Sequence, residues 1–178
     1  LVAAEGHRIA TGFVGTPIVC DALIDVGEVD TAYRLLLQTE APGWLYPVLH
    51  GATTIWERWD GIRADGTRNP GEMSSFNHYA LGAVADWLHR TVAGLAPAEP
   101  GYRRLLVRPV PGPGLDHASA EHHTPYGRAE VSWRRDGEAI SVEATVPPNT
   151  TATVVLPDGR GPFAVGSGDH HWHCERNP

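Results

Sequence analysis

The first part of the chain carries apolar residues at the spacing of amphipathic helices. Between residues 12 and 38 they recur every three or four positions, and the pattern breaks near Gly27, where a helix is expected to end. Pro17 suits the first turn of the first helix, and the polar residues 25–28 suit a turn. The pattern therefore predicts two antiparallel helices.

A third apolar stripe predicts a longer helix. Ser74 or Ser75 can cap its start, and the stripe continues to about Gly94, which places His78 in the first turns. Two segments before it are rich in turn formers. We expect residues 41–51 to form a loop that reaches a site, and residues 61–72 to form a functional loop or lid.

The hydrophobic pattern changes period after the segment 96–101, where we place a domain boundary between residues 1–97 and residues 98–178. Beyond it, short segments rich in β-formers alternate with turn signals, which predicts an antiparallel β-sandwich. We expect the tail from Gly161 to hold at most one more strand and then a flexible, His-rich end. The expected strands are residues 104–109, 118–123, 127–134, 139–146 and 151–156.

Composition excludes several classes of protein. The chain has 178 residues, 42% of them hydrophobic, and no apolar run long enough to cross a bilayer, so we expect a soluble globular protein without a membrane partner. The formal charge of -7 and the absence of a basic patch argue against nucleic acid as a partner. Cys20 and Cys174 are expected to be free thiols or at most one bridge. The start lacks the features of a signal peptide, so we expect the chain to begin inside a fold.

Residues 53–60, Thr-Thr-Ile-Trp-Glu-Arg-Trp-Asp, contain the strongest candidate site. Glu57 lies between two indoles and beside an arginine. Sugars present apolar faces that stack on aromatic rings and hydroxyls that bind charged groups, so this composition favours a sugar site. The alternative is the start of a helix with buried Trp side chains and a solvated Glu57 and Arg58.

Other chemistry has weaker support. Residues 169–175 hold ligand types that suit zinc or copper, but a terminal, glycine-flanked segment is more typical of a solvated tail, and His117, His122 and His123 suit a strand surface. We therefore predict neither a metal nor a cofactor. Nucleophilic catalysis is not expected, since no Gly-x-Ser-x-Gly motif occurs and Cys20 lies within a helical apolar stripe.

Three segments together resemble the C-terminal end of a bacterial α-L-rhamnosidase, a large modular glycoside hydrolase. They are residues 53–60, the sequence Met-Ser-Ser-Phe-Asn-His-Tyr at 73–79, and Tyr-Arg-Arg-Leu-Leu-Val-Arg-Pro at 102–109. The resemblance covers nearly the whole chain. It implies an α-then-β fold, in which the last helices of an (α/α)6 catalytic barrel precede an antiparallel β-sandwich.

The resemblance also implies roles for individual residues. Glu57 corresponds to the general base of an inverting reaction, and His78 to a side chain that contacts the bound rhamnose. The rest of the motif is matched by Trp56, Arg58, Trp59 and Asp60, to which we give site-wall or supporting roles in substrate binding.

One part of the family pattern is missing from these residues. An inverting glycosidase needs a second carboxyl group as general acid, and in the family it lies far upstream in the barrel. The chain is therefore expected to be an inactive fragment, whose partners are the N-terminal part of the same enzyme and a rhamnosylated glycoside or polysaccharide.

Two other functions remain open at this point. The chain could be a non-catalytic carbohydrate-binding module in which Trp44, Trp56 and Trp59 form a stacking platform. It could also belong to an (α/α)6 hydrolase that acts on a different sugar.

Overall fold

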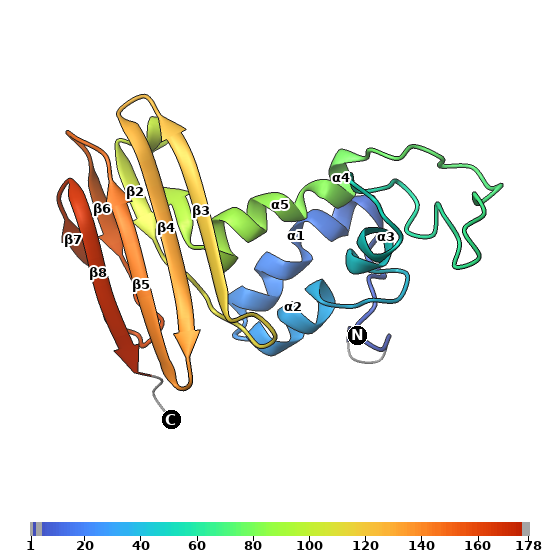
Figure 1. The fold of residues 1–178 in the computed structure, drawn as a ribbon, viewed down its shortest axis with the longest axis horizontal. Helices are drawn as coiled ribbons and strands as arrows, with labels where there is room; N and C mark the ends of the chain where they lie inside the picture. Colours follow the sequence, from blue (N-terminus) through green and yellow to red (C-terminus); the bar gives the residue numbers. More distant parts are fainter. Residues whose placement is uncertain (1, 3–4, 176–178) are drawn as a thin grey trace. The chain divides into compact units, whose positions relative to one another are not determined.

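The computed structural model describes residue 2 and residues 5–175 (Figure 1). The chain divides into two compact units, Leu1–Ala85 and Asp86–Pro178. Among the described residues, no helix has both the length and the apolar character that a membrane span requires.

The two predicted N-terminal helices are present as α1, Gly12–Asp25, and α2, Val29–Leu36. Gly27 separates them in the left-handed conformation (φ 80°), and its N–H donates to Ile24 O at 3.0 Å while Glu28 N–H donates to Leu23 O at 2.8 Å. This is a Schellman motif, which explains why the helix ends at a glycine. Pro17 lies inside α1 and not in its first turn.

The third predicted helix begins later than expected and is not continuous. It consists of α4, Tyr79–Gly82, α5, Val84–Trp87, and a π-helical turn, Leu88–Val92. His78 precedes it in an extended conformation (φ -128°, ψ 116°). The residues before His78 cannot be helical because they are hydrogen-bonded to a distant segment, described below. The predicted loop 41–51 contains a short helix, α3, Leu45–Leu49.

The second unit contains two four-stranded sheets. In the first, the strand order is β1 (Leu95–Pro97), β2 (Arg104–Val107), β6 (Thr151–Val154) and β7 (Phe163–Val165). The strands β2 and β6 are parallel, and the other neighbouring pairs are antiparallel. The second, entirely antiparallel sheet has the order β3, His117–Thr124, β4, Gly127–Asp136, β5, Ala139–Val146, and β8, Gly168–Glu175.

Buried side chains of both sheets form one core, as expected for a β-sandwich. In β4, Ala129, Val131 and Trp133 point inward, and Trp133 donates its indole N–H to Val92 O at 2.7 Å. The α-then-β fold class predicted from the sequence is confirmed.

Two details of the second unit differ from the prediction. Residues 95–97, assigned to the helical part, form β1 and pair with β2. The His-rich segment is the strand β8, hydrogen-bonded along β5, where a flexible end was expected. Only the last residues of that predicted end, 176–178, lie outside the described residues.

Candidate functional site

Two extended segments meet in the first unit and bring Glu57 and His78 together. The Glu57 N–H donates to Ser75 O, and the His78 N–H donates to Ile55 O, each at 2.9 Å. Thr54 Oγ1 donates to Phe76 O in the same pairing. These contacts place two side chains that are 21 positions apart in the sequence on one side of the paired segments.

The two oxygens of the Glu57 carboxylate have different surroundings. Oε2 accepts a hydrogen bond from the Ser75 N–H at 3.1 Å, whereas Oε1 lies 4.0 Å from His78 Nε2, too far for a direct hydrogen bond. The side chains of Glu57 and His78 are 21% and 23% exposed. The carboxylate is thus held at one oxygen and partly open to solvent.

Aromatic stacking holds the His78 ring in place. Phe13, on α1, stacks on the imidazole at a centroid distance of 4.5 Å, and Tyr79 stacks at 5.7 Å. His78 Nδ1 is buried and has no hydrogen-bond partner among the described residues. The orientation of Nε2 toward Glu57 is therefore set by ring contacts.

A concave pocket of about 370 Å³ lies beside Glu57. This volume is typical of small-molecule sites, which span about 300–1,000 Å³. The pocket is lined by Glu57, Arg58, Trp59 and Asp60 together with Gly12, Phe13, Thr16, Met73 and Leu81. Four consecutive residues of the predicted motif therefore share one pocket with residues of α1.

The two indoles of the motif lie in different places. Trp59 lines the pocket and packs edge-on against Trp44, with centroids 6.0 Å apart. Trp56 is only 5% exposed and packs edge-on against Phe76 at 5.3 Å. Trp59 is thus placed to contact a ligand, and Trp56 is placed to support the wall behind it.

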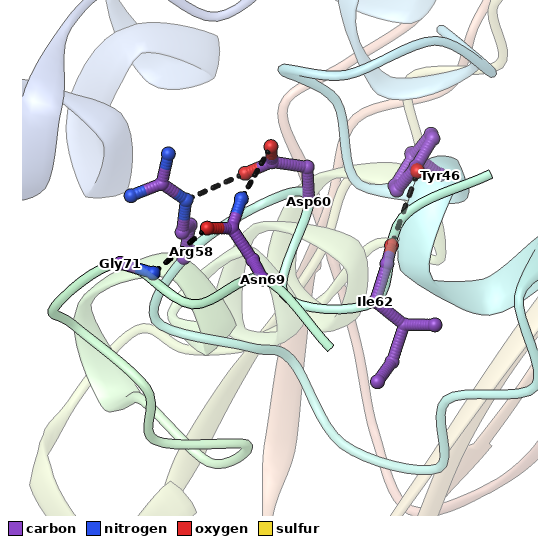
Figure 2. A network of polar contacts seen from close by, with 6 residues as sticks. All are labelled: Tyr46, Arg58, Asp60, Ile62, Asn69 and Gly71. Carbon is purple, nitrogen blue, oxygen red and sulfur yellow. Dashed lines mark hydrogen bonds and ion pairs between the residues drawn. The ribbon is translucent and has the colours of Figure 1, made fainter. Parts of the chain in front are cut away.

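Asp60 is engaged by two donors (Figure 2). Arg58 Nε donates to Asp60 Oδ1 and Asn69 Nδ2 donates to Asp60 Oδ2, both at 2.8 Å. Asn69 Oδ1 accepts from the Gly71 N–H at 3.0 Å. A Cβ atom on Gly71 would lie 2.8 Å from Arg58 Nη1, so a side chain at this position would push the end of the guanidinium aside. Asp60 and Asn69 therefore fix the position of Arg58.

Residues 61–72, predicted to form a functional loop or lid, contain a small hairpin and no regular element beyond it. An isolated bridge joins Ile62 to Arg68, and Asp65 Oδ1 accepts from the Thr67 N–H at 2.9 Å. The Thr67 hydroxyl also donates to Asp65 Oδ1, at 2.6 Å, and this bond together with the N–H bond holds the pKa of the Asp65 carboxyl below its usual value. The hairpin returns the chain to Asn69, whose N–H donates to Gly61 O at 2.9 Å.

Sequence reasoning did not find Phe13, Asn69, Gly71 or Ser75. Each of these residues acts through a partner that is far away in the sequence or through its own backbone. Residue type alone therefore gives no signal for Phe13 or Ser75. Asn69-Pro-Gly71 is a turn sequence, and a turn directly after the motif was the one available indication.

Cys20 does not offer an alternative nucleophile. Burial, with a further contribution from Asp21, raises the pKa of the Cys20 thiol to about 12. The thiol therefore stays protonated at neutral pH and is a poor nucleophile. Both Cys20 and Cys174 are buried free thiols, so the disulfide bond that the sequence left open is not formed between them.

Comparison with known proteins identifies the class to which this fold and pocket belong. The model of the bacterial alpha-L-rhamnosidase 6 hairpin glycosidase domain matches residues 1–92, and that of the bacterial alpha-L-rhamnosidase C-terminal domain matches residues 94–171. A helical glycosidase domain is thus followed by a β-sandwich. The chain belongs to the bacterial α-L-rhamnosidase family, which confirms the resemblance seen in the sequence.

Individual relatives agree with this assignment. An alpha-L-rhamnosidase of Streptomyces avermitilis is 40% identical over 97% of this chain, and one of Formosa agariphila is 42% identical over 88%. The structure of the native Aspergillus terreus enzyme matches 98% of the chain with a TM-score of 0.93 and 47% identity. That of the Streptomyces avermitilis enzyme complexed with L-rhamnose matches 98% with a TM-score of 0.89 and 39% identity.

The chain is much shorter than these relatives. It spans 18% of the Streptomyces avermitilis protein and 17% of the Formosa agariphila protein. It likewise covers 21% and 19% of the two solved chains. The chain thus corresponds to a fragment of each.

Removal of the Asn69 side chain is expected to loosen Arg58. Asn69 is 8% exposed, and its loss leaves one oxygen of Asp60 without its amide donor. A hydrogen bond to a charged group is worth about 1.5–3 kcal/mol, so Asn69→Ala should lower kcat/KM about tenfold or more in an enzyme completed as described below. Thr67→Ala, at the exposed tip of the same hairpin, is the matched control and should stay near wild type. An equal loss in both variants would contradict a specific role for Asn69.

Proposed function

We propose that the complete enzyme containing this chain hydrolyses terminal α-L-rhamnosyl groups of glycosides or polysaccharides with inversion, and that Glu57 is its general base. The observation that carries the proposal is the position of Glu57: it lines the pocket, and its Oε1 is turned toward His78 while Oε2 is held by the Ser75 N–H.

In this mechanism, Glu57 Oε1 accepts a proton from a water molecule as the water oxygen attacks the anomeric carbon. A second carboxyl group, on the opposite face of the sugar, donates a proton to the leaving oxygen. Inverting enzymes keep the two carboxyl groups about 6.5–9.5 Å apart to leave room for the water. The general acid is assigned to the upstream part of the enzyme.

Residues that line the pocket, together with His78 and Trp56 next to it, bind and orient the sugar. We assign His78 Nε2 to a sugar hydroxyl, Trp59 to an apolar face of the ring, and Arg58 to a hydroxyl at the far wall. Because Arg58 Nε is occupied by Asp60, the guanidinium would contact the sugar through its terminal nitrogens. Trp56 and Asp60 act by supporting these side chains.

The upstream part of the enzyme is the partner that the first unit requires. Val14 and Ile18 of α1 and Val26 at its C-cap are 89%, 61% and 73% exposed, and Val14 and Ile18 lie four residues apart on one face of the helix. Exposed apolar faces of this kind are normally covered in a folded protein. The remaining helices of the (α/α)6 barrel are the proposed cover, and the isolated chain is expected to be inactive.

The function can be tested with a hybrid enzyme in which this chain replaces the matching segment of the Streptomyces avermitilis relative. We expect the hybrid to hydrolyse an aryl α-L-rhamnoside and the isolated chain to show no turnover. Proton NMR of the first product should show the inverted anomer. A folded hybrid without turnover, or a product with retained configuration, would overturn the proposal.

The alternative of a carbohydrate-binding module needs a platform of exposed indoles. Trp44 and Trp56 are only 3% and 5% exposed, so two of its three proposed indoles are covered. Calorimetry of the isolated chain with rhamnose separates the two functions. Tight binding by the isolated chain would favour the module.

A further inference from the structure

The solvent-facing side of the sheet β3-β4-β5-β8 carries polar side chains in register across all four strands. One row consists of Ser119, Ser132, Glu143 and His171, which are neighbours on successive strands. His173 lies two residues beyond His171 in β8 and therefore on the same face. The intervening Trp172 points to the other face, where it packs against the core.

His171 and His173 converge on one point. Their Nε2 atoms are 2.9 Å apart, and their ring centroids are 4.4 Å apart with an angle of 77° between the planes. At this distance the two nitrogens share a proton, with one as donor and the other as acceptor. One imidazole lone pair and one imidazole N–H thus meet there, and a shift of that proton to the far ring nitrogen would leave two lone pairs in one small volume.

Glu143 decides which nitrogen of His171 is the acceptor. Its Oε1 lies 3.3 Å from His171 Nδ1 on the adjacent strand. A carboxylate beside Nδ1 favours the proton there and leaves a lone pair on Nε2. Histidine ligands of metals usually donate the second ring N–H to a carboxylate, a backbone carbonyl or a water molecule, and Glu143 takes the first of these roles here. The arrangement prepares His171 to bind a cation through Nε2.

The distance between the two nitrogens also fits a metal. Two nitrogens bound in cis positions at about 2.0 Å from one ion lie about 2.8 Å apart, which is the geometry of tetragonal Cu(II) or Ni(II). A tetrahedral zinc ion would separate them to about 3.3 Å. The observed 2.9 Å matches the first arrangement.

The surrounding charge favours a cation. A hollow of about 290 Å³ lies beside His171 and is lined by the carboxylates of Glu130, Glu143 and Asp169. Asp169 Oδ1 accepts from Thr145 Oγ1 at 2.8 Å, which holds it beside the hollow. The basic side chain Arg128 forms ion pairs with Glu121 and Glu130, at 2.8 and 2.6 Å, so its positive charge is compensated by these two carboxylates.

We propose that His171 and His173 form a surface site for a divalent transition metal, with Cu(II) preferred, and that Glu143 orients His171. The Irving–Williams order and the cis geometry both favour Cu(II) over zinc. Among the described residues, no group of three or more His, Cys, Asp or Glu side chains could hold a metal ion together. The two imidazoles therefore supply the protein donors, and solvent completes the coordination. This site is independent of the proposed hydrolysis.

The test adds CuCl2 to the 178-residue chain, which carries no affinity tag. Binding is followed by calorimetry and by electron paramagnetic resonance. We expect one Cu(II) per chain with two equatorial nitrogen donors. His171→Asn and His173→Asn should each lower the affinity about tenfold or more and remove one nitrogen from the spectrum. Loss of an orienting carboxylate typically costs about 10–100-fold in metal affinity, so Glu143→Gln should weaken binding while both nitrogens remain.

His123→Asn is the matched control, because His123 Nε2 lies 3.0 Å from Glu121 Oε1 and forms a histidine–carboxylate pair on another strand of the same sheet. It should bind Cu(II) as the wild type does. Circular dichroism will establish that each variant is folded. The proposal is overturned if folded His173→Asn binds like the wild type, or if His123→Asn loses as much affinity.

Discussion

Replacement of Glu57 by Gln in the hybrid enzyme is expected to lower kcat by a factor of about 10² to 10⁴, the usual contribution of a positioned general base. Gln has the same shape, and its side-chain oxygen can still accept the hydrogen bond that the Ser75 N–H makes at 3.1 Å. It cannot take a proton from water at neutral pH. The fold and the pocket should therefore persist while the chemical step is lost.

Kinetics with an aryl α-L-rhamnoside and with a natural rhamnoside will measure this effect. Glu72→Gln is the matched control, since Glu72 is an exposed carboxylate in the loop between the two site segments. It should keep kcat near the wild-type value. A Glu57→Gln enzyme that turns over within a few-fold of the wild type would exclude Glu57 as the base and leave its contact with His78 without a catalytic role.

Trp133→Ala should produce the largest loss of stability, about 3–5 kcal/mol in the free energy of unfolding of the second unit. The Trp133 side chain is 2% exposed and belongs to the core that both sheets share. Truncation leaves a cavity in the sandwich. It also removes the indole N–H that donates to Val92 O at 2.7 Å, so that a buried carbonyl loses its partner.

Urea unfolding followed by far-UV circular dichroism will measure this loss. Trp133→Phe keeps most of the ring and should cost about 1–3 kcal/mol, mainly from the unpaired carbonyl. Trp172→Ala is the control for loss of an indole, because Trp172 is only partly buried against the same core. If Trp172→Ala destabilised the chain as much as Trp133→Ala, the core would not be centred on Trp133.

Local patterns predicted much of the fold. The helices α1 and α2 were found because apolar spacing and the helix-ending Gly27 act within a few residues. Most strands of the sandwich were found because β-formers alternate between turn signals. The strand β8 was missed because Asp-His-His-Trp-His has weak β-propensity. It forms because β5 pairs with its backbone and the core covers Trp172.

The candidate site was predicted in part for the same reason. Glu57, Arg58, Trp59 and Asp60 are adjacent in the sequence, so their combination was visible as a motif, and the structure places all four around one pocket. The predicted start of the third helix was wrong because the backbone groups of Ser75 and His78 are hydrogen-bonded to the segment 55–57. Such pairing depends on atoms far away in the sequence, and residue type does not reveal it.

The amino-acid sequence by itself determined the order of helices and strands, the family resemblance, and the residue types of the sugar-site motif, because these depend on local spacing and on neighbouring residues. Only the tertiary structure decided that Trp56 is covered while Trp59 lines the pocket, that Asn69 and Asp60 fix Arg58, and that His171 and His173 meet beside Glu143. Each of these outcomes depends on which backbone segments pair and which face of a strand the core covers, and that choice is made by the folded chain as a whole.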